Sequence, residues 1–83
     1  MFRIAICDDN KYDIKTISSA LDVLREEGVE LETVAFTDGF DLIKNFENGT
    51  RYHLLILDMV MDSINGIETA KRIREYDVSM PIL

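Results

Sequence analysis

The run Leu54–Leu57 constrains the fold more than any other part of the chain, because four apolar residues follow one another and stop at Asp58. A strand with one face in water alternates apolar and polar side chains, and this run does not alternate. It therefore predicts a short strand with both faces covered, as in a parallel sheet between two layers of helices. The run is far too short to cross a membrane.

Similar apolar runs recur along the chain and alternate with amphipathic segments. Strands are expected at Phe2–Cys7, at 29–36, at 52–57 and from Met80 to Leu83, where Pro81 lies near the start of the strand. In 29–36 the acidic residues alternate with apolar ones, which indicates that the first half of that strand is exposed on one side.

Three helices are expected between these strands. The first is capped by Asp9 or Asn10, ends at Gly28, and has an apolar face formed by Ile14, Ile17, Leu21 and Leu24. The second follows the turn 37–39 and ends near residues 48–49. The third opens at Gly66, with Ile67, Ala70 and Ile73 directed inward and the basic residues of 71–74 directed outward.

Strands that alternate with helices predict an α/β fold with a parallel sheet, right-handed crossovers and helices on both faces. The chain has 83 residues, enough for one domain over 1–83, and it contains no repeat, linker or low-complexity segment.

Composition narrows the class of protein. There are 16 acidic and 9 basic residues, for a net charge of -7, so this segment is not expected to contact nucleic acid. Cys7 is the single cysteine and fits a small buried apolar role, with no internal disulfide.

The N-terminus enters a strand directly and reaches Asp8, unlike a signal peptide. A cytoplasmic domain without membrane contact is expected.

Acidic residues end two of the expected strands, Asp8 and Asp9 the first and Asp58 the third. The carboxyl ends of parallel strands share one edge of the sheet, where ligands of such sheets bind. If these two strands are neighbours, three carboxylates converge, and they stay ionised together only when a cation neutralises them. Oxygen ligands with room for water favour Mg²⁺, which would neutralise charge on a phosphoryl group.

The chain resembles receiver domains of two-component signalling along its whole length. The matching segments are Ile4–Asp9, Leu54–Asp58, Met61, Asn65–Glu68 and Met80–Leu83. An acidic pair after one strand is a common feature. Its combination with an aspartate that ends the third strand, and with Gly66 eight residues later, is much more specific.

The resemblance implies a role for each site residue. Asp58 is implied as the phosphoacceptor. Asp9, Asp58 and the backbone carbonyl of Val60 are implied as direct Mg²⁺ ligands, with Asp8 acting through water. Met59, Met61, Asp62 and Gly66 belong to the loop around the phosphorylation site.

The resemblance also implies a flavodoxin-like fold with strand order 2-1-3-4-5, of which this chain has only the start of the fourth strand. It is therefore interpreted as a receiver truncated on its C-terminal side. The Thr or Ser that follows the fourth strand in the family, and the Lys that follows the fifth, are not among the 83 residues. An exposed sheet edge at the C-terminal side would favour a homodimer or strand exchange.

The implied partners are a sensor histidine kinase, as phosphodonor, and a C-terminal DNA-binding output domain that controls transcription. Segments 64–68 and 72–74 are similar to receivers that precede a LytTR-type output domain. One position departs from the family pattern, because many receivers have proline where this chain has Asp62. That difference affects the geometry of the loop and the lifetime of the phosphorylated state.

Two other functions use the same acidic residues. A Mg²⁺-dependent phosphohydrolase with an aspartyl-phosphate intermediate would need a second acid two residues after its nucleophile, but Val60 follows Asp58 and Asn10 follows Asp8. A receiver-like module that binds without phosphorylation would not need all three acids. A signalling switch is therefore favoured over an enzyme. His53 lies near the start of the third strand, away from its carboxyl end and so at the opposite edge of the sheet, and is not expected to carry phosphate.

Overall fold

The computed structural model describes residues 1–83, and its elements follow the predicted alternation of strands and helices. They are β1 (Phe2–Cys7), α1 (Lys11–Glu26), β2 (Leu31–Phe36), α2 (Gly39–Glu47), β3 (Leu54–Leu57) and α3 (Gly66–Arg74). No helix has the length and apolar character needed to span a membrane.

The three strands form one parallel sheet in the order β2-β1-β3, so β1 lies in the middle. Ala5 pairs with Val34 on one side and with Leu55 on the other. This order confirms that the first and third strands are neighbours. The expected fourth strand over 80–83 is reduced to a single parallel bridge between Leu55 and Ile82.

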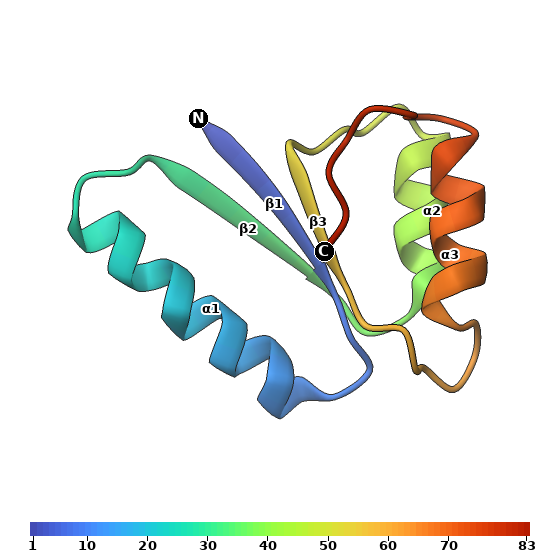
Figure 1. Ribbon diagram of the computed structural model, residues 1–83, viewed down its shortest axis with the longest axis horizontal. Coiled ribbons are helices and arrows are strands. Elements are labelled where there is room, and N and C mark those ends of the chain that lie inside the picture. Colours follow the sequence, from blue (N-terminus) through green and yellow to red (C-terminus); the bar gives the residue numbers. More distant parts are fainter.

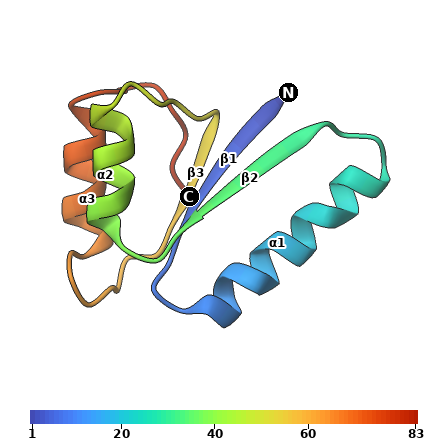
Figure 2. The ribbon, with the colours of Figure 1, turned by 180° about the vertical axis from the view of Figure 1, so that it is seen from behind.

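Helices cover both faces of the sheet, as predicted. Both ribbon views place α1 on one side of the sheet and α2 with α3, lying next to each other, on the opposite side (Figures 1 and 2). The main core lies between the sheet and the α2–α3 layer. Its buried members are Ala5, Cys7, Leu42, Ile43, Phe46, Tyr52, Leu55, Leu57, Met61, Ile64, Ile73 and Met80.

The α1 side of the sheet is less well covered than the sequence predicted. Ile4 and Ile6 are buried there, but α1 itself contains no buried residue. Leu54 and Ile56 of β3 are only half-buried. Both faces of β3 are therefore covered as predicted, but the cover is tighter on the α2–α3 side than on the α1 side.

Side chains cap each helix at its N-terminus. Asn10, rather than Asp9, caps α1 and accepts hydrogen bonds from the N–H groups of Tyr12 and Asp13. Asp38 caps α2 in the same way, and Asn65 caps α3. Each cap satisfies backbone donors that have no partner inside the helix.

Two strand boundaries differ from prediction. β2 begins at Leu31 instead of residue 29, because the N–H of Val29 bonds to the carbonyl of Leu24 and belongs to the end of α1. β3 begins at Leu54 instead of residue 52.

The inward face of α3 also differs from prediction. Ile67 is 59% exposed, whereas Thr69 is fully buried. The buried stripe is Gly66, Thr69 and Ile73, spaced three and four residues apart, and Ile67 lies beside it.

Candidate functional site

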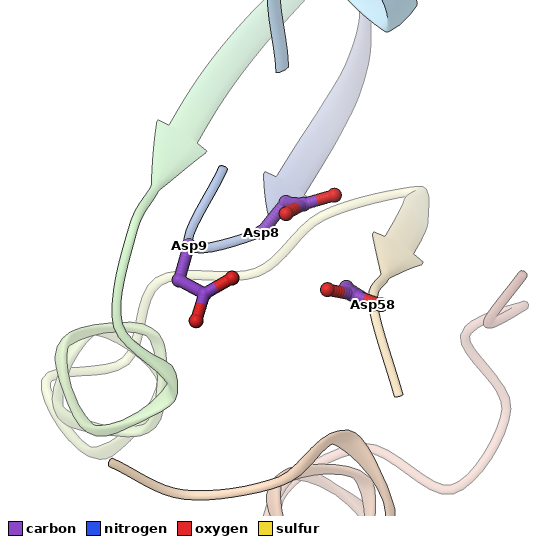
Figure 3. Close-up of side chains that lie close together, drawn as sticks. All are labelled: Asp8, Asp9 and Asp58. Atoms are coloured by element: carbon purple, nitrogen blue, oxygen red, sulfur yellow. The ribbon is translucent and has the colours of Figure 1, made fainter. Parts of the chain in front are cut away.

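Three aspartates meet where β1 and β3 end. The N–H of Asp8 bonds to the Phe36 carbonyl, and the N–H of Asp58 bonds to the Cys7 carbonyl, so the strand ladders continue into the site. Each of Asp8, Asp9 and Asp58 offers a carboxylate oxygen, and these oxygens lie within 4.8 Å of one another. Figure 3 shows the three side chains gathered between the ends of the two strands. The predicted convergence is confirmed.

The three carboxylates differ in exposure. Asp8 is buried, Asp58 is half-buried, and Asp9 is exposed. Burial raises the pKa of Asp8 above its ordinary value, and the charges of Asp58, Asp13 and Asp9 raise it further, while the Asn10 N–H opposes the shift. The charged groups named here as acting on Asp8 are acidic, so the site has the electrostatic character of a cation site.

Each carboxylate accepts one backbone N–H group. Asp8 accepts from Asn10 at 2.9 Å, and Asp58 accepts from Val60 at 3.2 Å; both donors lie two residues further along the same loop. Asp9 accepts instead from Asp62, at 3.1 Å, and this bond joins the loop after β1 to the loop after β3.

The loop between β3 and α3 is fixed by two buried side chains. Met61 and Ile64 are each 7% exposed and belong to the core, whereas Met59 and Val60 are exposed beside the site. Of the two methionines in the loop, Met61 therefore packs into the core and Met59 does not.

Gly66 allows this loop to pack closely against the start of α3. A Cβ atom at residue 66 would lie 2.3 Å from the Asp58 carbonyl oxygen and 2.7 Å from the Met59 Cα. The Gly66 N–H donates to the Met59 carbonyl at 3.0 Å. A residue with a side chain cannot occupy this position unless the backbone next to Asp58 moves.

Cys7 lies in the core behind the acidic cluster, as predicted for a small buried residue. Its thiol is close to the Met61 sulfur, at 3.8 Å. Burial, reinforced by the nearby aspartates, raises the pKa of Cys7 to about 12. The thiol is therefore protonated and unreactive at neutral pH.

His53 is not part of the site. Its Nδ1 accepts the Arg3 N–H at 2.8 Å, and its ring stacks on Phe2, before β3 and at the opposite edge of the sheet. Two of the three basic residues of α3 are likewise engaged elsewhere: Arg72 pairs with Glu68, and Arg74 donates to the Met80 carbonyl.

Sequence reasoning missed two contributors to the site. The spacing of Asn65 and Glu68 is typical of a helix start and could have identified the cap of α3. The hydrogen bond from Asp62 to Asp9 had no signal in the sequence, because the donor is a backbone group.

The donors present fit Mg²⁺. They are carboxylate oxygens from two adjacent strand ends, with one member exposed to water, and Mg²⁺ prefers a few carboxylate ligands together with several waters. The roles of individual residues toward the metal, including the Val60 carbonyl, stay predictions.

The sequence model of the "Response regulator receiver domain" family matches residues 4–83. The chain belongs to this family. Receiver domains are signalling switches that bind Mg²⁺ in an acidic pocket, so the assignment accounts for the aspartate cluster at the end of the sheet.

Known proteins and structures agree with the assignment. The chain is 30% identical to the transcriptional regulatory protein CpxR homolog of Haemophilus influenzae over 83 residues, which are 100% of the chain and 33% of that protein. It is 34% identical to the response regulator TrrA of Thermotoga maritima, solved in complex with Mg²⁺ and BeF, with a TM-score of 0.70 over 99% of this chain and 66% of that one.

TrrA has also been solved in complex with the histidine kinase ThkA. That structure matches this chain with 33% identity and a TM-score of 0.74, over 99% of this chain and 66% of the matched chain. The chain thus spans about one third of the bacterial relative's length and two thirds of the matched structures.

Proposed function

We propose that the domain accepts a phosphoryl group on Asp58 and passes the signal on by a change in partner affinity. The observation that carries the proposal is the position of Asp58, whose carboxylate follows the core strand β3 and lies within 4.8 Å of two other carboxylates. Phosphorylation would add charge and acceptor oxygens at this edge of the sheet, which can bias a two-state element.

Asp9, Asp58 and the backbone carbonyl of Val60 would hold Mg²⁺ directly, with Asp8 acting through water. Support comes from the all-oxygen donor set and from the acidic charges of Asp58, Asp13 and Asp9, which raise the pKa of Asp8. When bound, Mg²⁺ would neutralise charge on the three carboxylates and on the transferred group.

Residues of the chain would carry out the phosphoryl transfer itself. An Asp58 oxygen attacks phosphorus, an acyl-phosphate P–O bond forms, and the donor's P–N bond breaks when the donor is a phosphohistidine. The Val60 N–H, already on one oxygen of Asp58, orients the carboxylate. The exposed Met59 and Val60 side chains border the approach to it.

The proposed partners are a sensor histidine kinase and a C-terminal DNA-binding output domain. The kinase is supported by the TrrA–ThkA complex among the similar structures. The output domain and its control of transcription are supported by the name of the Haemophilus relative. A LytTR-type output domain and a cytoplasmic location belong to the same proposal.

The phosphoacceptor is tested with acetyl phosphate and Mg²⁺. Mass spectrometry after borohydride trapping is expected to locate one modification, at Asp58, and Asp58→Asn is expected to abolish it because the nucleophile is gone. The matched control is His53→Asn, which removes the one histidine and should leave modification unchanged. Modification that persists in Asp58→Asn, or that maps to His53, would contradict the assignment.

The metal ligands are tested by calorimetric titration with Mg²⁺. The parent protein is expected to show one saturable site, and Asp9→Ala should weaken binding by about tenfold or more because a ligand is lost. Asp13→Ala removes an equal charge from the nearby first turn of α1 and serves as the control. Equal affinity of Asp9→Ala and the parent would show that Asp9 is not a ligand.

A further inference from the structure

Asp9 differs from the other two aspartates of the site in how its side chain is held. Its carboxylate is exposed, and the Asp62 N–H is the only hydrogen bond that the structure gives it. Asp8 and Asp58 are held by donors two residues along their own loops. The donor to Asp9 is 53 residues away in sequence, so its position depends on the fold of the β3–α3 loop.

The Asp62 amide is held firmly although its side chain is exposed. Met61, immediately before it, is buried, and so is Ile64, two residues after it. Both belong to the core cluster between the sheet and the α2–α3 layer. These anchors fix the backbone on either side of Asp62, and the N–H therefore has a defined direction toward Asp9.

The bond leaves Asp9 with one free oxygen. Oδ2 accepts the Asp62 N–H, while Oδ1 has no hydrogen bond. A carboxylate that is restrained through one oxygen loses less conformational freedom when the other oxygen takes a ligand. The donor is part of the backbone, so any residue except proline can provide it.

We propose that the backbone N–H of Asp62 is a positioning group for Asp9, orienting its free oxygen for the cation and linking the two loops that form the site. The proposal rests on the Mg²⁺ site described under the proposed function. It assigns the role to the N–H of Asp62 and not to its side-chain carboxylate.

Two variants separate the donor from the charge. Asp62→Pro and Asp62→Ala both remove the carboxylate, but only Asp62→Pro removes the N–H. In calorimetric titrations, Asp62→Pro should bind Mg²⁺ about tenfold more weakly than Asp62→Ala, as is typical when a group that orients a ligand is lost. A thermal melt in EDTA checks that both variants fold.

Hydrogen exchange of the Asp62 amide tests the bond in the metal-free protein. The amide should exchange slowly in the parent and much faster in Asp9→Ala, in which the acceptor is missing. If Asp62→Pro does not fold, this exchange measurement still tests whether the Asp62 N–H is bonded to Asp9.

Each negative outcome has a separate meaning. Equal Mg²⁺ affinity of folded Asp62→Pro and Asp62→Ala, or an Asp62 amide that exchanges equally fast in the parent and Asp9→Ala, would overturn the positioning role. A parent protein that shows no saturable Mg²⁺ binding, with a protected Asp62 amide, would instead overturn the proposed metal site.

Discussion

Asp8 is the only charged side chain that the fold buries. Its burial and three neighbouring acids raise its pKa, so the folded protein holds the proton of Asp8 more tightly than the unfolded chain does. The free energy of unfolding therefore decreases as pH rises from the ordinary value of 3.8 through the raised value. At neutral pH the metal-free protein carries this electrostatic cost, which a bound cation would relieve.

Asp8→Asn should therefore stabilise the metal-free protein at pH 7. The amide keeps an oxygen for the Asn10 N–H but carries no charge. Thermal melts in EDTA are expected to show a higher midpoint for Asp8→Asn than for the parent at pH 7, and the difference should shrink as pH falls toward 3.8, where Asp8 is protonated in the folded parent.

The control for net charge is Glu30→Gln, which removes the same charge at an exposed position between α1 and β2. If both variants raised the thermal midpoint equally, the stabilisation would come from the change in overall charge. A gain for Asp8→Asn that grows toward low pH would contradict the sign of the pKa shift.

At the scale of elements, the start of α3 and the end of β3 are in direct contact through Gly66. Gly66→Ala would place a methyl group against the Asp58 carbonyl and the Met59 Cα, and backbone cannot move aside as a flexible side chain does. The variant should lose about 1–3 kcal/mol of stability, as is typical of overpacking. It should also bind Mg²⁺ more weakly, because the displaced loop carries Val60 and Asp62.

Gly49→Ala is the matched control in denaturant unfolding and Mg²⁺ titration. Residue 49 has a positive φ of 92° and an added Cβ would contact nothing within 4 Å, so the alanine costs about 1 kcal/mol through backbone strain alone. It should leave Mg²⁺ affinity unchanged. Normal Mg²⁺ binding in Gly66→Ala would show that the close packing at Gly66 does not shape the site.

The order of elements and the aspartate cluster could be predicted from the sequence, because apolar runs mark strands and parallel strands end at one edge. The inward face of α3 could not, since the count of apolar residues favoured Ile67. Thr69 is buried there because its hydroxyl donates to the Asn65 carbonyl, which satisfies its polar group inside the core.

The contact between Asp62 and Asp9 was equally beyond sequence reasoning. It depends on where a backbone N–H lies after Met61 and Ile64 enter the core, and residue types alone do not carry that information. The start of β2 was mispredicted for the same reason, because a backbone bond from the Val29 N–H to the Leu24 carbonyl ties residue 29 to the end of α1.

At the scale of the whole molecule, the two faces of the sheet are unequal. The α2–α3 side holds the 12-residue core, while α1 contributes no buried residue to the other side. On that side Leu54 and Ile56 are half-buried, and Leu83 is 72% exposed beside them at the sheet edge. Apolar surface next to an edge segment with free backbone groups favours association with another chain.

A polypeptide made of residues 1–83 alone is therefore expected to self-associate, by strand pairing or exchange at the segment 81–83. Leu83→Lys should shift its light-scattering mass toward that of one chain, because a charge at a sheet edge opposes pairing. Val78→Lys adds the same charge at a position that is 83% exposed in the turn before this segment, and it should leave the association unchanged. A parent chain that is monomeric at all concentrations and melts in one sharp transition would show that α1 alone covers this face well enough.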